Sequence, residues 1–221
     1  KKISLNEVLK RWTTPLEEVF PTNPGGPGTM ADMPSVDFVA PEIKGYHGPM
    51  IGTPKPKVLI PAFPGTNCEM DSLRAFQKAG GDGEILVLRN LTQSALAESI
   101  EVLAQKIKSS QIIMIPGGFS GGDEPEGSAK FITAVFRNPV IMEAVTELLQ
   151  KRDGLMLGIC NGFQALIKLG LVPYGEIRPQ KADSPTLTYN TIGRHMSCLV
   201  RTRVASTLSP WLSACQVGDV H

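Results

Sequence analysis

The sequence lacks several features that would assign it at once to a broad class of protein. Its 22 lysines and arginines nearly balance 21 aspartates and glutamates, so a net charge of +1 gives no electrostatic footprint for nucleic acid or an anionic membrane. No apolar run approaches the ~20 residues that span a bilayer. The N-terminus, KKISLNEVLKRW, has no apolar segment typical of a signal peptide. We therefore expect neither nucleic acid nor membrane as a partner.

Cysteine pairs and zinc patterns are also missing. Cys68, Cys160, Cys198 and Cys215 form no C-x-x-C pair and no cluster with histidine at zinc-ligand spacing, so no metal site is predicted. Four scattered cysteines without a secretion signal favour reduced thiols and a cytoplasmic protein. One of them is then available as a nucleophile.

The composition changes near residue 56. Residues 1–56 hold nine of the 18 prolines and are predicted to be a linker or connecting segment, with a short helix from Ser4 to about Val19. From Lys57 on, short apolar runs alternate with helical patterns, which predicts an α/β domain over residues 57–221. Its sheet should be doubly wound and mostly parallel, with helices on both faces. Strands are expected at 58–63, 84–88, 111–115 and 155–159, and an antiparallel strand at 197–204. Helices are expected from about Thr92 to Lys108 and from Asn161 to Leu169.

The strongest chemical signal is GICNG, residues 158–162, where an apolar strand meets a helix. This spacing is typical of a nucleophile elbow, a turn so tight that small residues are needed on both sides of the nucleophile. Cys160 would lie at a helix N-terminus, which favours the thiolate. The N–H of Asn161 could serve half of an oxyanion hole. A structural cysteine in a tight turn is the alternative interpretation.

Two other segments follow strands. IMIPGGFSGGDEPEG, residues 113–127, is rich in glycine and could complete the oxyanion hole, although it could also be a flexible loop. It is not a phosphate loop, because no G-K-[ST] follows. PAFPGTNCEMD, residues 61–71, contains Cys68, which lacks the elbow spacing and is predicted to be a non-catalytic thiol.

A cysteine nucleophile usually needs a histidine base. His47, His195 and His221 are the three histidines, and none is followed closely by a carboxylate. A structural role is the simpler interpretation for each of them.

Four segments in order resemble the class I, triad-type glutamine amidotransferases, and among these the C-terminal glutaminase domain of phosphoribosylformylglycinamidine synthases. They are PGTNCEMD (64–71), PGGFSGGDE (116–124), GICNGFQ (158–164) and the stretch around NTIGRH (190–195). The resemblance implies a flavodoxin-like fold for residues 57–221. Residues 1–56 resemble the connecting end of the synthetase portion of the large single-chain form.

The resemblance also implies roles for individual residues. Cys160 would be the nucleophile. Backbone N–H groups would hold the oxyanion at Gly118, Phe119 and Asn161, and the substrate glutamine would be bound by Gly117, Ser120 and Gln164.

The implied reaction belongs to purine biosynthesis. Cys160 would attack the glutamine amide, form a γ-glutamyl thioester and release ammonia. The ammonia would pass to a synthetase domain of the same polypeptide, where ATP activates the amide oxygen of formylglycinamide ribonucleotide. ATP and magnesium belong to that domain, and no cofactor is expected in this chain.

One departure from the family pattern is serious. The family has a His and a Glu as H-x-E, within H-G-E-G-R beyond the nucleophile, and no H-x-E occurs in these 221 residues. VGDVH resembles the stretch before that segment, so His221 is not expected to be the base. The chain is interpreted as a fragment cut at both ends. Another elbow-cysteine hydrolase of the same fold and a catalytically silent interaction module stay open as alternatives.

Overall fold

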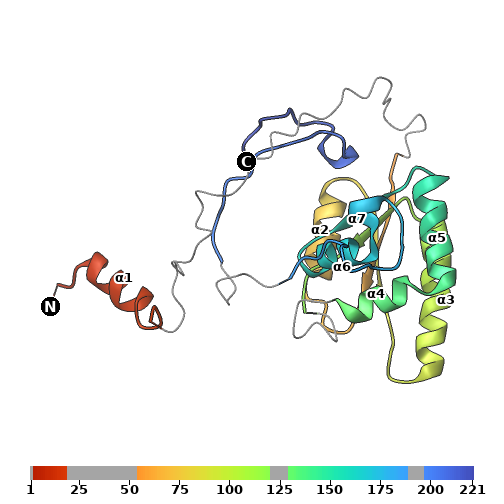
Figure 1. Ribbon diagram of the computed structural model, residues 1–221, viewed down its shortest axis with the longest axis horizontal. Helices are drawn as coiled ribbons and strands as arrows, with labels where there is room; N and C mark the ends of the chain where they lie inside the picture. Colours follow the sequence, from red (N-terminus) through yellow and green to blue (C-terminus); the bar gives the residue numbers. More distant parts are fainter. Residues whose placement is uncertain (1, 19–53, 120–128, 189–196) are drawn as a thin grey trace. The chain divides into compact units, whose positions relative to one another are not determined.

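The computed structural model describes residues 2–18, 54–119, 129–188 and 197–221. The chain divides into two units: Ile51–Thr188 is one, and Lys1–Met50 together with Tyr189–His221 forms the other. The larger unit contains the sheet and the helices that pack on it (Figure 1). Residues 19–53, which are most of the predicted connecting segment, lie outside the described residues.

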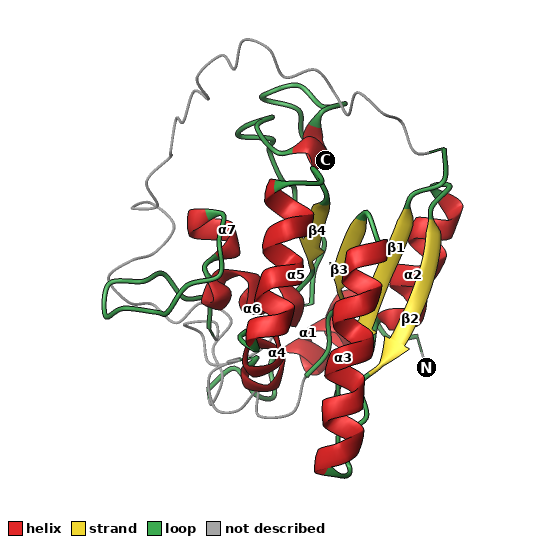
Figure 2. Ribbon diagram, turned by 90° about the vertical axis from the view of Figure 1, so that its right-hand side faces the viewer, coloured by secondary structure: helices red, strands yellow, loops and turns green. Residues whose placement is uncertain are grey.

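A parallel sheet of four strands forms the centre of the described part of the larger unit, in the order β2-β1-β3-β4 (Figure 2). The strands are β1 Lys57–Ala62, β2 Asp82–Val87, β3 Ile112–Ile115 and β4 Leu155–Gly158. β1 and β3 are the central pair and are almost wholly buried, as expected of apolar strands covered on both faces. This strand order matches four strands of the flavodoxin-like order, and it confirms the predicted doubly wound sheet.

Helices cover both faces of the sheet, as predicted. On one face, Val58 and Ile60 of β1 pack toward Leu73 of α2, Glu69–Lys78. On the other face, the intervening Leu59 joins a larger cluster, because successive side chains of a strand point to opposite faces. The helices of that cluster are α3 Gln93–Ser109, α4 Lys130–Phe136, α5 Pro139–Gln150 and α6 Asn161–Leu169. Figure 2 shows α3 and α5 on the side of the sheet away from α2.

Helix boundaries follow from local signals in the sequence. The hydroxyl of Thr92 accepts a hydrogen bond from the Ala95 N–H at 3.1 Å and begins α3. Asn138 caps α5 in the same way, with Pro139 at the first helical position. α6 ends at Gly170, whose φ of 92° permits the left-handed conformation that closes a helix; the short helix α7, Leu171–Tyr174, follows.

Two predictions for residues of the smaller unit differ from the structure. The helix predicted from Ser4 to about Val19 is shorter, because α1 covers Leu5–Thr13. It is exposed along its length, and the Ser4 side chain makes no capping hydrogen bond. The strand predicted at 197–204 is wrong: only an isolated antiparallel bridge forms there, between Arg203 and Val220. Alternation of apolar and basic residues predicted a half-buried strand, but the segment has no sheet beside it to pair with in the described ranges. A 3-10 turn, η2, follows at Pro210–Leu212. No helix in the described parts of the chain is long and apolar enough to cross a bilayer.

Candidate active site

The turn between β4 and α6 has the geometry of a nucleophile elbow. Cys160 lies at the N-cap of α6 with φ 53° and ψ −110°, a backbone conformation that residues other than glycine rarely adopt. The Gly162 N–H donates to the Ile159 carbonyl at 2.9 Å, and the Gln164 N–H donates to the Cys160 carbonyl at 2.9 Å. These bonds close the turn directly into the helix, so the thiol is held at the carboxyl end of β4.

Both glycines of G-x-C-x-G are required by contacts. A Cβ at Gly158 would lie 2.6 Å from the carbonyl oxygen of Gly162, and real Cβ atoms essentially never come closer than 3.0 Å to such an atom. A Cβ at Gly162 would overlap the carbonyl of Ile115 at the end of β3. The spacing therefore reports how closely α6 approaches the ends of two strands.

The Cys160 side chain is exposed and is not part of a disulfide. Gly117, two residues beyond β3, lies beside it: a Cβ built there would be 3.3 Å from the Cys160 Cβ and 3.8 Å from the sulfur of Cys68. Cys68 is the N-cap of α2, and it too is exposed. The two thiols thus come from different loops at one edge of the sheet, although the sequence predicted a role for only one.

Two segments that resemble the family, PGTN (64–67) and PGGF (116–119), are joined by backbone hydrogen bonds. The Asn67 N–H donates to the Gly117 carbonyl at 3.2 Å, and Thr66 forms an antiparallel bridge with Gly118. Gly118 has φ +145°, and a Cβ there would be 2.5 Å from the carbonyl oxygen of Gly65. The loop after β3 is therefore fixed onto the loop after β1, beside the elbow.

The same pairing involves a residue predicted to contribute to the oxyanion hole. The Phe119 N–H donates to the Gly65 carbonyl at 2.9 Å. The oxyanion role of Phe119 stays a prediction. Its side chain is 73% exposed. Gly118 follows Gly117, which lies beside Cys160. Its predicted role in the oxyanion hole also stays a prediction.

Asn161 and Gln164 follow the nucleophile on α6. Asn161 is buried at 1% exposure, and its side-chain N–H donates a hydrogen bond to the side-chain Oε1 of Gln164 at 3.1 Å. This bond orients the half-buried Gln164 side chain one turn into the helix. The roles predicted for both residues, oxyanion donor and substrate contact, stay predictions, as does that of Gly117.

The remaining candidates lie outside the described part of the larger unit. Ser120, His47 and His195 lie outside the described residues, and His221 belongs to the smaller unit. Thr66, for which no role was predicted, shapes the neighbouring loop: its hydroxyl accepts a hydrogen bond from the Phe63 N–H at 3.0 Å. The P-G-T sequence after a buried strand, typical of a tight turn, was the available signal.

Comparison with known proteins assigns the family. Residues 55–221 match the CobB/CobQ-like glutamine amidotransferase domain. The chain belongs to this family. Among curated relatives it is 35% identical over 161 residues to the phosphoribosylformylglycinamidine synthase subunit PurQ of Symbiobacterium thermophilum, covering 73% of this chain and 56% of that subunit. It is 37% identical over 144 residues to PurQ of Dehalococcoides mccartyi, covering 63% and 49%.

The amidotransferase chain spans about half the length of the curated relatives it matches. Among solved structures, a chain of PurLQS from Thermotoga maritima matches with a TM-score of 0.53 and 24% identity. The match covers 76% of this chain and 64% of that chain. That likeness supports the fold. Family membership confirms the resemblance carried by GICNGFQ and PGGFSGGDE.

Proposed function

We propose that this amidotransferase domain is the glutaminase part of a phosphoribosylformylglycinamidine synthase. The observation that carries the proposal is Cys160, held by two glycines in a left-handed turn at the start of α6. The names of the curated relatives, which are subunits of that synthase, supply the reaction. The exposed thiol at this turn supports nucleophilic attack on an acyl carbon.

The proposed chemistry begins with the Cys160 thiolate, which adds to the side-chain amide carbon of glutamine. Backbone N–H groups at the start of α6 stabilise the oxyanion of the tetrahedral intermediate. The nitrogen then takes up a proton and the C–N bond breaks. Ammonia departs, and a γ-glutamyl thioester on Cys160 remains. Water hydrolyses the thioester to glutamate and regenerates the thiol. The family's H-x-E pair, which would move these protons, is not among the 221 residues.

The partner follows from the same proposal. The ammonia goes to a synthetase domain, which uses ATP and magnesium to make an amidine from formylglycinamide ribonucleotide. We place that domain on the same polypeptide, since residues 1–56 resemble the connecting end of the synthetase portion of the single-chain form. The reaction would take place in the cytoplasm, consistent with the free cysteines of the described chain.

Affinity labelling tests the site. A chloroketone analogue of glutamine should alkylate Cys160, glutamine should protect it, and Cys160→Ser should abolish the labelling. Cys198→Ser, which removes an exposed thiol of the other unit, is the matched control and should label normally. Labelling that glutamine does not slow, but another amide does, would favour a different elbow-cysteine hydrolase. No labelling of Cys160 under any condition would favour a silent interaction module.

A further inference from the structure

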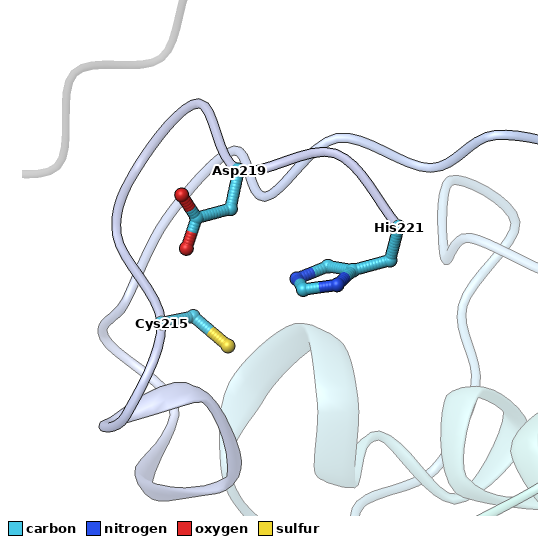
Figure 3. Close-up of side chains that lie close together, drawn as sticks. All are labelled: Cys215, Asp219 and His221. Carbon is cyan, nitrogen blue, oxygen red and sulfur yellow. The ribbon is translucent and has the colours of Figure 1, made fainter.

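Three side chains with metal-binding atoms gather in the smaller unit. One ligand atom each from Cys215, Asp219 and His221 lies within 4.8 Å of the others. Figure 3 shows the sulfur, the carboxylate and the imidazole directed into one space. The sequence predicted no metal site, because C-x3-D-x-H is not a familiar zinc spacing.

Backbone pairing places two of the three ligands on one side of the chain. Thr202 and His221 exchange N–H···O bonds of 3.0 and 2.9 Å, and the Val204 N–H donates to the Asp219 carbonyl at 2.8 Å. These bonds flank the isolated bridge between Arg203 and Val220 and hold residues 219–221 alongside 202–204. Because side chains two residues apart in an extended segment point the same way, Asp219 and His221 present their ligand atoms together.

A tight turn returns the third ligand to the same place. Gly218 has φ +99°, a left-handed conformation that glycine adopts readily, and the Asp219 N–H donates to the Gln216 carbonyl at 3.1 Å. The Gln216 N–H in turn donates to a carboxylate oxygen of Asp219 at 2.7 Å. The turn thereby brings Cys215 opposite the extended segment, and the hydrogen bond holds the Asp219 carboxylate in position.

We propose that Cys215, Asp219 and His221 form a binding site for a divalent transition metal, with zinc as the favoured ion. Thiolate, imidazole and carboxylate are the ligands that zinc takes from proteins, with bonds of about 2.0–2.3 Å. Tetrahedral geometry with such bonds separates ligand atoms by roughly 3.3–3.8 Å. The side chains therefore need to close by about 1 Å, which small rotations supply.

The remaining features of the site suit such an ion. Cys215 and Asp219 are half-buried, while His221 is exposed, so the ion can enter without opening the fold. The deprotonated thiol and the carboxylate together balance the charge of a divalent cation. The Gln216 N–H on Asp219 is the kind of outer hydrogen bond that orients a ligating carboxylate. Three protein ligands leave a fourth position for water or another donor.

Cobalt(II) is the probe, because its spectrum reports thiolate ligation. The full chain, without an affinity tag and carrying Cys160→Ser to remove the elbow thiol, is titrated with Co²⁺. We expect saturation at one equivalent, with a sulfur-to-metal charge-transfer band of the intensity of a single thiolate. Zn²⁺ should displace it. Cys215→Ser should abolish the band, and His221→Ala should weaken binding at least about tenfold. Cys198→Ser is the matched control and should bind normally.

Several outcomes would overturn the proposal. They are a charge-transfer band that survives Cys215→Ser, a band that disappears with Cys198→Ser, or no saturable binding by the parent chain. The backbone hydrogen bonds between residues 202–204 and 218–221 do not depend on the substituted side chains, so the variants should keep the fluorescence of Trp211. Should Cys215→Ser change that fluorescence, the one-thiolate intensity and the one-equivalent endpoint of the parent chain still decide the question.

Discussion

Replacing Cys160 by glycine should stabilise the fold, although it removes the proposed nucleophile. Cys160 adopts φ 53° and ψ −110°, and a residue held in such a sparsely populated region stores about 1–3 kcal/mol of strain. Glycine relieves that strain but loses about 0.5–1 kcal/mol more backbone entropy on folding. The thiol is exposed, so its removal sacrifices little packing. The expected net gain lies between roughly 0 and 2.5 kcal/mol, with about 1 kcal/mol as its midpoint.

Thermal unfolding followed by circular dichroism measures this gain. For a chain of this size, 1 kcal/mol corresponds to about 2–4 °C in Tm. Cys160→Ala, which removes the sulfur but keeps the Cβ, should unfold close to the parent, and Cys160→Gly should unfold several degrees higher. Ala79→Gly is the matched control, because Ala79 is an exposed helix-end residue with an ordinary φ of −80°.

The control should lose about 0.5–1 kcal/mol, the usual effect of glycine where no strain is relieved. The reasoning is refuted when Cys160→Gly is destabilised relative to Cys160→Ala by a similar amount. That result would mean that the backbone at position 160 is unstrained, and the elbow would lose its main structural support.

Three further results are expected. Gly162→Ala should lower the free energy of unfolding by about 1–3 kcal/mol, because the added Cβ overlaps the Ile115 carbonyl. The loss should exceed that of Gly175→Ala, whose added Cβ meets open space although its φ is +76°. Equal losses in urea unfolding would contradict the tight elbow. Limiting iodoacetamide should label Cys160 ahead of the two thiols of the smaller unit, since Cys160 is exposed at a helix N-terminus, a position typical of reactive cysteines. Peptide mapping that finds the reverse order would count against the elbow as the reactive site. Because no H-x-E occurs in the 221 residues, they should release ammonia from glutamine about 10²–10⁴-fold more slowly than a family member that has this pair. An ordinary rate would show that a histidine of this chain is the base.

The sheet and its helices were predictable because their signals are local. Apolar runs such as IIMI of β3 contain no polar side chain, so they are expected to be buried. Each run is followed by a glycine, a helix cap or an amphipathic stretch. The expected bounds of α6, Asn161–Leu169, agree with the structure, since the elbow fixes its start and Gly170 its end. The predicted α3, from Thr92, agrees within a residue because Thr92 is a true cap.

Pairing between distant segments could not be predicted from the sequence. The Phe119 N–H donates to the Gly65 carbonyl, and nothing near Phe119 in the sequence indicates that contact. The pairing of Thr202 with His221 likewise creates the smaller unit's ligand cluster in place of a strand at 197–204. Alternation of side chains describes one segment and does not identify its partner.

The position of the nucleophile is a property of two strands as well as of one turn. Gly162 abuts the Ile115 carbonyl at the end of β3, and Gly117, two residues later, abuts the Cβ of Cys160. The register that pairs Ile115 with Gly158 therefore sets both contacts. A shift of β3 against β4 would remove the space that each glycine provides. G-x-C-x-G is consequently a weak signal when it occurs alone and a strong one when P-G-G follows a neighbouring parallel strand, because the second pattern supplies the surface on which the first is built.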